Sequence, residues 1–267
     1  FWCSMDLAVI QRTAVKAALR GAVELKAYFG KLETVAKKGR IDLVTQADLA
    51  SEAKIIETIH SRFPDHAILA EESGFGGGSG PVRWVIDPLD GTTNYTHGLP
   101  IFAISIAAEA DGETLAGVVL DPIGGELFSA ITAQGATLND HPIRVSQTRS
   151  VTDALLITGF PYEWGDQRGL IMERFSRCAL ASRGVRRLGA AALDLCYLAA
   201  GRADAYWEGQ LKPWDSAAGA LIAREAGATV TDYGGNEHTG NTAELLASNG
   251  HIHAEMIALL QAAMDPT

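Results

Sequence analysis

Five short β-type runs follow one another between residues 67 and 131, and they constrain the fold more than any other feature of the sequence. They are Ala67–Ala70, Val82–Asp87, Ala103–Glu109, Leu115–Asp121 and Glu126–Ile131. Asp111-Gly112 is typical of a hairpin turn between the third and fourth runs. The glycine-rich stretch Gly74–Gly80 separates the first two runs and predicts a mobile surface loop. Consecutive strands joined by tight turns predict an antiparallel sheet.

Two helices are predicted ahead of this sheet. Apolar residues recur with a helical period from Asp6 to about Phe29. A second helix is predicted to open at Thr45, whose hydroxyl can cap the amide of Asp48, and to end before Phe63. Because two helices are expected to flank the sheet, residues 5–150 are predicted to form an α+β region.

The pattern changes after about Ser150 to alternating strands and helices. The predicted strands are Ala154–Gly159, Val185–Leu188 and Ala203–Glu208, with short strands near Val230 and at Leu245–Ser248. The predicted helices are Asp166–Ala181, an Ala-rich helix from Ala190, Ser216–Ala226 and His251–Ala263. We therefore predict a second, α/β region over residues 151–267, joined to the first without a flexible linker.

Composition narrows the expected partners and compartment. The formal net charge is −10, and an acidic chain has no sequence-independent attraction to nucleic acid or to anionic lipid. No apolar run approaches the roughly 20 residues of a membrane span, and no signal-peptide pattern is visible. Cys3, Cys178 and Cys196 show no paired or metal-type spacing, which favours a reducing compartment. We expect a cytoplasmic protein with no nucleic-acid and no membrane partner.

The segment Trp84–Asn94 carries the strongest chemical signal. A β-type run ends at Asp87, and Pro88 is expected to stop the ladder and to fix a turn. Asp87 and Asp90, three residues apart around that turn, can point into one space. Gly91 and the two threonines after it predict a helical turn that offers unpaired backbone N–H groups to an anion. Two acids beside such a turn indicate hard cations between them, and Mg²⁺ takes oxygen ligands while keeping positions for phosphate and water.

Two further acidic positions join this pattern. Glu71-Glu72 follows the first predicted strand, where adjacent carboxylates by themselves are typical of a solvated strand end. Asp215 is predicted at the N-cap of the Ala-rich helix Ser216–Ala226, and by itself it is typical of a capping residue. A cap and a metal ligand are not exclusive. A phosphate-ester substrate would also require cations in a chain of this net charge.

With these motifs in this order, the chain resembles the inositol monophosphatase family of the lithium-sensitive, magnesium-dependent phosphatase superfamily. The motifs are Glu71-Glu72-Ser73, DPxDGTTN at Asp87–Asn94 and WDxAAG at Trp214–Gly219. The resemblance covers nearly the whole chain. It implies an α/β fold, α+β in the first half, in which helices and sheets alternate as a layered α-β-α-β-α sandwich of the inositol monophosphatase / fructose-1,6-bisphosphatase type. It also implies a homodimer, and metal ions at the junction of the two regions.

The resemblance implies a set of metal ligands. Glu71, Asp87 and the carbonyl of Leu89 would hold a first magnesium ion. Asp87, Asp90 and Asp215 would hold a second ion, and a third, weaker ion would lie near Glu71 through water. Lithium is expected to inhibit such a site.

The resemblance also implies substrate-side roles. Gly91 and Thr92 would bind phosphate through backbone N–H groups, and Thr92 with Glu71 and Asp90 would form the catalytic group that orients and activates water. The alcohol part of the substrate, which is the leaving group, would contact Glu208, the backbone near Ala191 and Asp215.

Three further positions have places in this scheme. Asp48 falls where the family has an acidic residue of supporting role. Lys37, expected in a mobile loop, matches a basic residue near the site, and Lys38 could take that place instead.

The function predicted first is hydrolysis of inositol monophosphates or similar small sugar phosphates by metal-activated water, without a nucleophilic side chain. Glu208, seven residues before Asp215, favours a polyol substrate. The alternatives are fructose-1,6-bisphosphatase, histidinol-phosphate phosphatase or 3′-phosphoadenosine-5′-phosphate phosphatase activity, or a non-catalytic regulatory binding protein on the same fold. Arg186-Arg187 could reach either a substrate or a subunit boundary.

Overall fold

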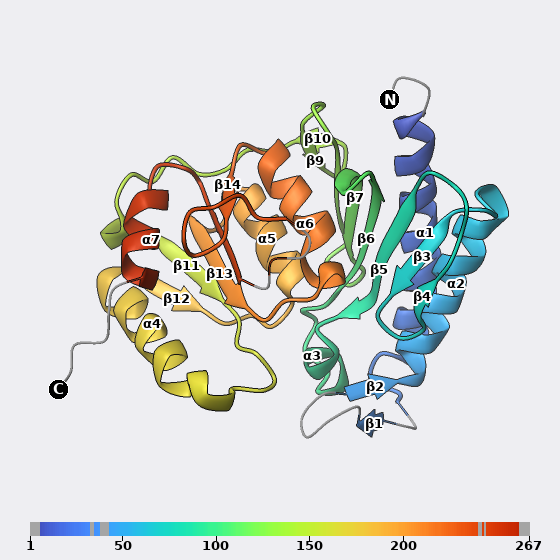
Figure 1. The fold of residues 1–267 in the computed structure, drawn as a ribbon. Coiled ribbons are helices and arrows are strands. Elements are labelled where there is room, and N and C mark those ends of the chain that lie inside the picture. Colours follow the sequence, from blue (N-terminus) through green and yellow to red (C-terminus); the bar gives the residue numbers. More distant parts are fainter. Residues whose placement is uncertain (1–5, 33–34, 38–42, 240–241, 243, 262–267) are drawn as a thin grey trace.

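The computed structural model describes residues 6–32, 35–37, 43–239, 242 and 244–261. Figure 1 shows five layers in which helices and sheets alternate. Helices α1 and α2 cover the outer face of a larger sheet, α5 and α6 lie between this sheet and a smaller one, and α4 and α7 cover the far face of the smaller sheet. The predicted α-β-α-β-α sandwich is confirmed. The split into regions 5–150 and 151–267 stays a prediction.

Eight strands form the larger sheet, in the order β10-β9-β8-β7-β6-β5-β3-β4. Their bounds are β3 Ala67–Ala70, β4 Gly74–Gly76, β5 Arg83–Asp90, β6 Ala103–Ala110, β7 Glu113–Asp121, β8 Glu126–Ile131, β9 Ala136–Leu138 and β10 His141–Pro142. The antiparallel pairing predicted for β5 to β8 is confirmed. Strands β3 and β5 instead run parallel, because a longer connection that includes β4 joins them rather than a tight turn.

The predicted loop Gly74–Gly80 is shorter than expected, because its first three residues form β4 against β3. The hairpin turn at Asp111-Gly112 lies where it was predicted, with φ angles of 52° and 84°. Both angles fall in the left-handed region that two-residue hairpin turns require.

Both predicted N-terminal helices are present. Helix α1 spans Leu7–Tyr28, and helix α2 spans Gln46–Arg62 after the N-cap residue Thr45. Ahead of α2, strands β1 (Val35–Lys37) and β2 (Leu43–Thr45) pair antiparallel. Lys37 therefore lies in a strand and not in the predicted loop, and β-branched residues favour this pairing. Lys38 lies outside the described residues.

Five strands form the smaller sheet, in the order β12-β11-β13-β15-β14. Their bounds are β11 Leu155–Thr158, β12 Gly184–Arg186, β13 Ala205–Gly209, β14 Thr229–Thr231 and β15 Glu244–Ser248. The helices here are α4 Arg168–Ala181, α5 Ala191–Ala199, α6 Pro213–Glu225 and α7 His253–Gln261. Every strand and helix predicted for this half is present, with shifted ends. No helix among the described residues is both long and apolar enough to cross a membrane.

Small residues let α6 lie close to the larger sheet and to α5, its neighbour in the middle layer. An ideal Cβ at Gly117 of β7 would lie 2.9 Å from the carbonyl oxygen of Ala218 in α6. On the other side of α6, a Cβ at Gly219 would lie 2.9 Å from the Leu195 side chain in α5. Because protein interiors are close-packed, α6 can occupy this position only if residues 117 and 219 are glycine.

We expect Gly117→Ala to lower the free energy of unfolding by about 1–3 kcal/mol, because the new methyl group meets backbone that cannot move aside. The matched control is Gly169→Ala in α4, where a Cβ meets nothing within 4 Å, and it should stabilise by about 0.4–1 kcal/mol. Urea unfolding followed by circular dichroism measures both. Equal stability of the two variants would contradict the close approach.

Candidate active site

A β-bulge in β5 brings Asp87 and Asp90 to the same side of the sheet. Three steps on β5, from Asp87 to Asp90, oppose two on β6, from Ser105 to Ala103. In a regular strand, residues three apart point to opposite faces, and the extra residue of a bulge restores a common face. The predicted end of the strand at Asp87 is wrong, because Pro88 interrupts the ladder within the bulge and pairing resumes at Asp90.

The turn after β5 has the predicted form. Gly91 has φ +92° and is the N-cap of the short helix α3 (Thr92–Thr96). A Cβ at Gly91 would lie 3.0 Å from the carbonyl oxygen of Ile101. Both the backbone angle and the close approach therefore require glycine.

Glu71 emerges beside Asp87 from the neighbouring strand. In the parallel pair β3–β5, Ala70 lies opposite Ile86, and the Glu71 N–H donates to the carbonyl of Ile86 at 3.1 Å. The carboxyl ends of parallel strands lie at the same edge of a sheet. The motif around Glu71 and the motif around Asp87 thus meet through strand pairing.

The first half of α2 forms a buried polar face behind these acids. The Ser51 hydroxyl donates to the carbonyl of Pro88 at 2.9 Å, and Asp48 lies 3.4 Å from the Thr92 hydroxyl. Asp48 also completes the capping box with Thr45. The hydroxyl of Thr92 is 3.0 Å from the carbonyl of Leu89. Helix α2 therefore fixes both the bulge and the turn that follows it.

Glu52, on the same face, escaped the sequence analysis. Its two oxygens accept from the N–H groups of Glu72 and Ser73, each at 3.0 Å, and its side chain is buried. These bonds hold the segment directly after Glu71. Asp48 and Glu52 are four residues apart and therefore lie on one face of the helix. This spacing could have indicated in the sequence that Glu52 belongs to the site.

Asp215 reaches the site from α6, in a position other than the one predicted. The helix begins at Pro213, which suits the first helical position, and its N-cap is Lys212. Asp215 is therefore the third residue of the helix and not its N-cap. One of its oxygens accepts from the N–H of Lys212 at 2.7 Å. The Ser105 hydroxyl of β6 donates to the carbonyl of Trp214 at 3.2 Å and ties this helix start to the larger sheet.

The acids at this junction repel one another. Burial raises the pKa of Asp87 well above its usual range, and the charges of Glu71, Asp90 and Asp215 raise it further. Burial likewise raises the pKa of Asp90, and brings that of Asp215 to about 7 with the help of Asp90 and Glu71. Burial also raises the pKa of Asp48 to about 6, to which Glu71 contributes. Such a group of buried carboxylates is stabilised by bound cations.

Asp90 also contacts the N-terminus of α5. Its oxygens accept from the N–H groups of Ala191 at 3.1 Å and Ala192 at 2.8 Å. A carboxylate offers about four lone-pair positions, so these bonds leave further positions for a cation. In this arrangement no three Asp, Glu, His or Cys side chains of the described residues converge as a ready-made metal site. The oxygen donors nevertheless match the ligands that Mg²⁺ prefers.

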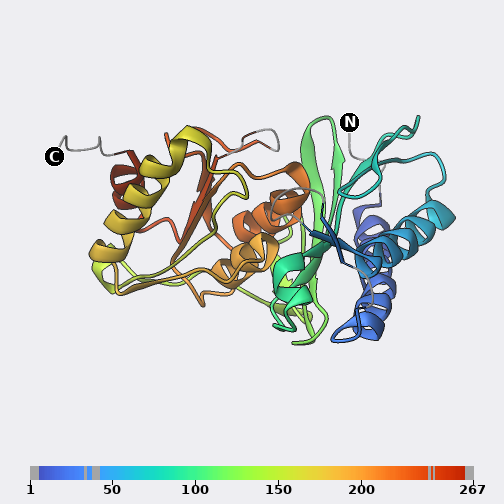
Figure 2. The ribbon, with the colours of Figure 1, turned by 90° about the horizontal axis from the view of Figure 1, so that it is seen from below.

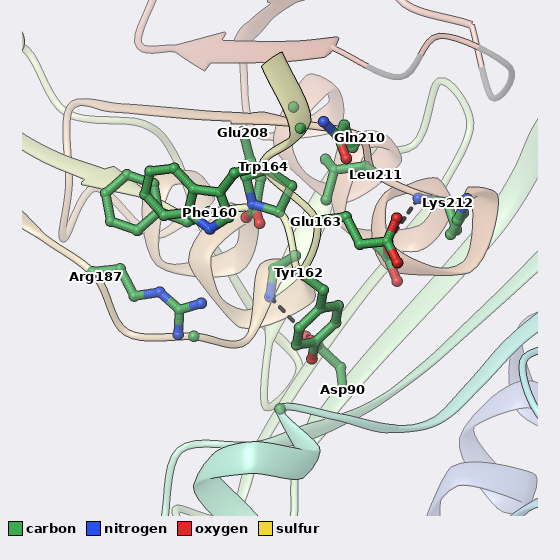
Figure 3. Close-up of a pocket in the computed structure, with 18 of the residues that line it drawn as sticks. Asp90, Phe160, Tyr162, Glu163, Trp164, Arg187, Glu208, Gln210, Leu211 and Lys212 are labelled. Carbon is green, nitrogen blue, oxygen red and sulfur yellow. Dashed lines mark hydrogen bonds between the residues drawn. The ribbon is translucent and has the colours of Figure 1, made fainter. Parts of the chain in front are cut away.

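A cavity of about 780 Å³ opens beside these acids. Five of the predicted residues line it: Asp90, Gly91, Ala191, Glu208 and Asp215. Glu71, Asp87, Leu89 and Thr92 do not line it, and Asp87 and Leu89 are buried behind it. Figure 3 shows Asp90 and Glu208 reaching the cavity from different elements.

Glu208 lies on β13 and depends on two neighbours. The Tyr206 hydroxyl donates to Glu208 Oε2 at 2.6 Å, and a Cβ at Gly159 would overlap the Glu208 carboxylate. Burial raises the pKa of Glu208 to about 7. Gly159 therefore leaves the space that this carboxylate occupies, a role that the sequence analysis missed.

The outer wall of the cavity was also missed, except for Arg187, which the sequence analysis expected to reach either a substrate or a subunit boundary. This wall consists of residues 160–165, together with Arg168, Arg187 and the segment 209–212. The rings of Phe160 and Trp164 lie side by side, 5.2 Å apart, as Figure 3 shows. Phe160, Tyr162 and Trp164 lie within five positions, and this cluster of aromatic residues could have indicated the wall in the sequence.

We expect Glu52→Gln to lower the free energy of unfolding by about 1–3 kcal/mol, because the amide group turns a donor toward a backbone N–H. Catalytic efficiency should fall as well, since the segment after Glu71 loses its anchor. Glu57→Gln on the exposed side of α2 is the control, and it removes surface ion pairs with Arg20 and Lys54 that contribute little. The hypothesis fails if both variants unfold at the same urea concentration.

The fold agrees with comparisons to known proteins. The sequence profile of the inositol monophosphatase family matches residues 6–265. An inositol-1-monophosphatase from Synechocystis is 45% identical, over 96% of this chain and 90% of that protein. The Nus factor SuhB of Pasteurella multocida is 43% identical, over 93% of this chain and 94% of that protein. The crystal structure of the extragenic suppressor protein suhB from Bartonella henselae has a TM-score of 0.92 at 38% identity, and the match covers 96% of this chain and all of that one.

Proposed function

The chain belongs to the inositol monophosphatase family, and we propose that it hydrolyses small phosphate monoesters with Mg²⁺, inositol monophosphate foremost. The observation that carries this proposal is the group of neighbouring acids Glu71, Asp87, Asp90 and Asp215, of which Asp90 and Asp215 line the cavity and Asp87 is buried behind it. Their mutual repulsion is relieved by hard cations, and cations give an acidic chain an affinity for phosphate.

In this proposal, Glu71, Asp87 and the carbonyl of Leu89 hold one ion, and Asp87, Asp90 and Asp215 hold another. Bound magnesium would lower the pKa of a water molecule and stabilise charge on the departing oxygen. A third, weaker ion near Glu71 and inhibition by Li⁺ belong to the same proposal.

The chain's own groups bind and orient the reactants. The backbone N–H groups of Gly91 and Thr92 bind the phosphate oxygens. The Thr92 hydroxyl, held near Asp48, orients the attacking water together with Glu71. Glu208 accepts hydrogen bonds from hydroxyl groups of the leaving group, whose other side faces the backbone at Ala191. Because Ala191 already donates to Asp90, this last contact requires a shared or displaced bond.

A second role is suggested by relatives that are named Nus factor SuhB. The same fold could act by binding a partner in that setting, with or without phosphatase activity. These names give no support to the expectation that the chain has no nucleic-acid partner. A homodimer and a cytoplasmic location stay predictions.

A substrate panel tests the proposed reaction. Phosphate release is measured from inositol 1-phosphate, fructose 1,6-bisphosphate, histidinol phosphate and 3′-phosphoadenosine 5′-phosphate, first with MgCl₂, then with LiCl added. We expect Mg²⁺-dependent release that is fastest from inositol 1-phosphate and reduced by Li⁺. No release from any of the four would refute the enzymatic proposal, and faster release from the nucleotide would refute only the substrate.

We expect Asp90→Asn to lower turnover by more than about a hundredfold, because the variant loses a ligand of the ion that would stabilise developing negative charge. The fold should persist, because the amide still accepts from one of the two N–H groups of α5. Asp111→Asn, in the exposed hairpin turn, is the control with the same change of charge. Steady-state kinetics, circular dichroism and calorimetric Mg²⁺ titration provide the readouts, and near-normal turnover of Asp90→Asn would refute the metal assignment.

A further inference from the structure

Arg187 turns its guanidinium into the cavity from the segment between β12 and α5. It lines the cavity together with Asp90 and Glu208, and Figure 3 shows its side chain directed inward. It makes no ion pair and no hydrogen bond with any other described residue. Its neighbour Arg186 does not line the cavity and donates to the carbonyl of Val185. Two consecutive arginines therefore have different surroundings.

The guanidinium lies close to the turn that contains Gly91. A Cβ at Gly189 would lie 2.5 Å from Arg187 Nη1, so the side chain crosses the backbone of Gly189 where only glycine leaves room. A Cβ at Gly91 would in turn lie 3.2 Å from the carbonyl oxygen of Gly189. Arg187 thus flanks the turn to which phosphate binding is assigned.

The acids near Arg187 do not use its donors. Its positive charge opposes the rise in the pKa of Glu208 and of Asp194, both of which are raised first by burial. Asp194 is fully buried, and neither of its oxygens has a hydrogen-bond partner among the described residues. Glu208 instead accepts from Tyr206. The guanidinium is therefore near both acids but paired with neither.

We propose that Arg187 is a substrate-binding residue whose guanidinium contacts phosphoryl oxygens of the bound substrate, which rests on the proposed phosphatase function. The planar guanidinium presents donors in a fork that matches phosphate geometry. Asp90, Glu208 and Asp215 line the same cavity and oppose a phosphate dianion there, and Arg187, like Arg168 and Lys212, offsets their negative charge. The phosphoryl group is either the ester that is cleaved or a second phosphate on the leaving group.

The test compares Arg187→Gln with Arg186→Gln, which removes the same charge one residue away and outside the cavity. KM and kcat are measured with MgCl₂ for inositol 1-phosphate, which has one phosphate, and for fructose 1,6-bisphosphate, which has two. The Kd of inorganic phosphate is measured by calorimetry in the same buffer, so one readout does not depend on turnover. Circular dichroism confirms that both variants are folded.

Loss of a charge-assisted contact should weaken binding by roughly tenfold or more. If Arg187 contacts the cleaved ester, KM for both substrates and the Kd of phosphate rise in Arg187→Gln alone. If it contacts a second phosphate, only KM for fructose 1,6-bisphosphate rises. The KM and Kd values of Arg187→Lys should lie between those of the wild type and of Arg187→Gln, because lysine keeps the positive charge but lacks the forked donors of the guanidinium.

The proposal is overturned if Arg187→Gln and Arg186→Gln have the same KM and Kd values. It is also overturned if the wild-type protein binds neither phosphate nor either substrate. A wild-type protein that binds phosphate but hydrolyses nothing would refute the proposed function only. In that case the Kd values of inorganic phosphate and of fructose 1,6-bisphosphate for the two variants, measured by calorimetry, would decide the role of Arg187.

Discussion

The repulsion among buried carboxylates is the constraint around which the rest of the structure is arranged. Asp87 and Asp90 lie on β5, Asp215 lies on α6, and Glu71 directly follows β3. Burial and the neighbouring negative charges disfavour the charged forms of Asp87, Asp90 and Asp215. Burying like charges costs free energy unless cations or hydrogen bonds compensate for it. The fold supplies some compensation itself, through the N–H groups of Leu89, Ala191, Ala192 and Lys212. The remaining repulsion is what bound cations would relieve in the proposed metal site.

Each layer of the sandwich contributes one part of that junction. The larger sheet brings Glu71 and Asp87 together through a parallel strand pair, and a bulge adds Asp90. Helix α2 secures this edge from outside through Ser51 and Glu52. The first turns of α5 and α6, in the middle layer, complete the junction. Small residues make this possible, because they allow α6 to approach β7. The acids are therefore fixed by packing over the whole molecule and not by one loop.

The sequence predicts the elements better than it predicts their details. Periodicity identifies the long helices and buried strands, and the strings around Asp87 and Asp215 identify the metal-binding candidates. The bulge after Asp87 could not be read from the sequence, because proline equally predicts the end of a strand. The helix start at Pro213 was missed because Asp215 looks like a cap. Glu52 and Gly159 escaped notice because their roles consist of contacts with residues far away in the chain, with Ser73 and Glu208 respectively.

The two sides of the cavity are built differently, and in the proposed function this would separate the reaction from the choice of substrate. The side with the acids is held by strand pairing and by buried hydrogen bonds, so a change there alters charge and packing together. The opposite side consists of residues 160–165 and 209–212, which connect elements of the smaller sheet and are mostly partly or fully exposed. An exposed side chain such as Arg168 can differ without disturbing a buried acid. Relatives with different substrates on this fold are therefore expected to differ in this outer wall first, while the group at Asp87 and Asp90 stays the same.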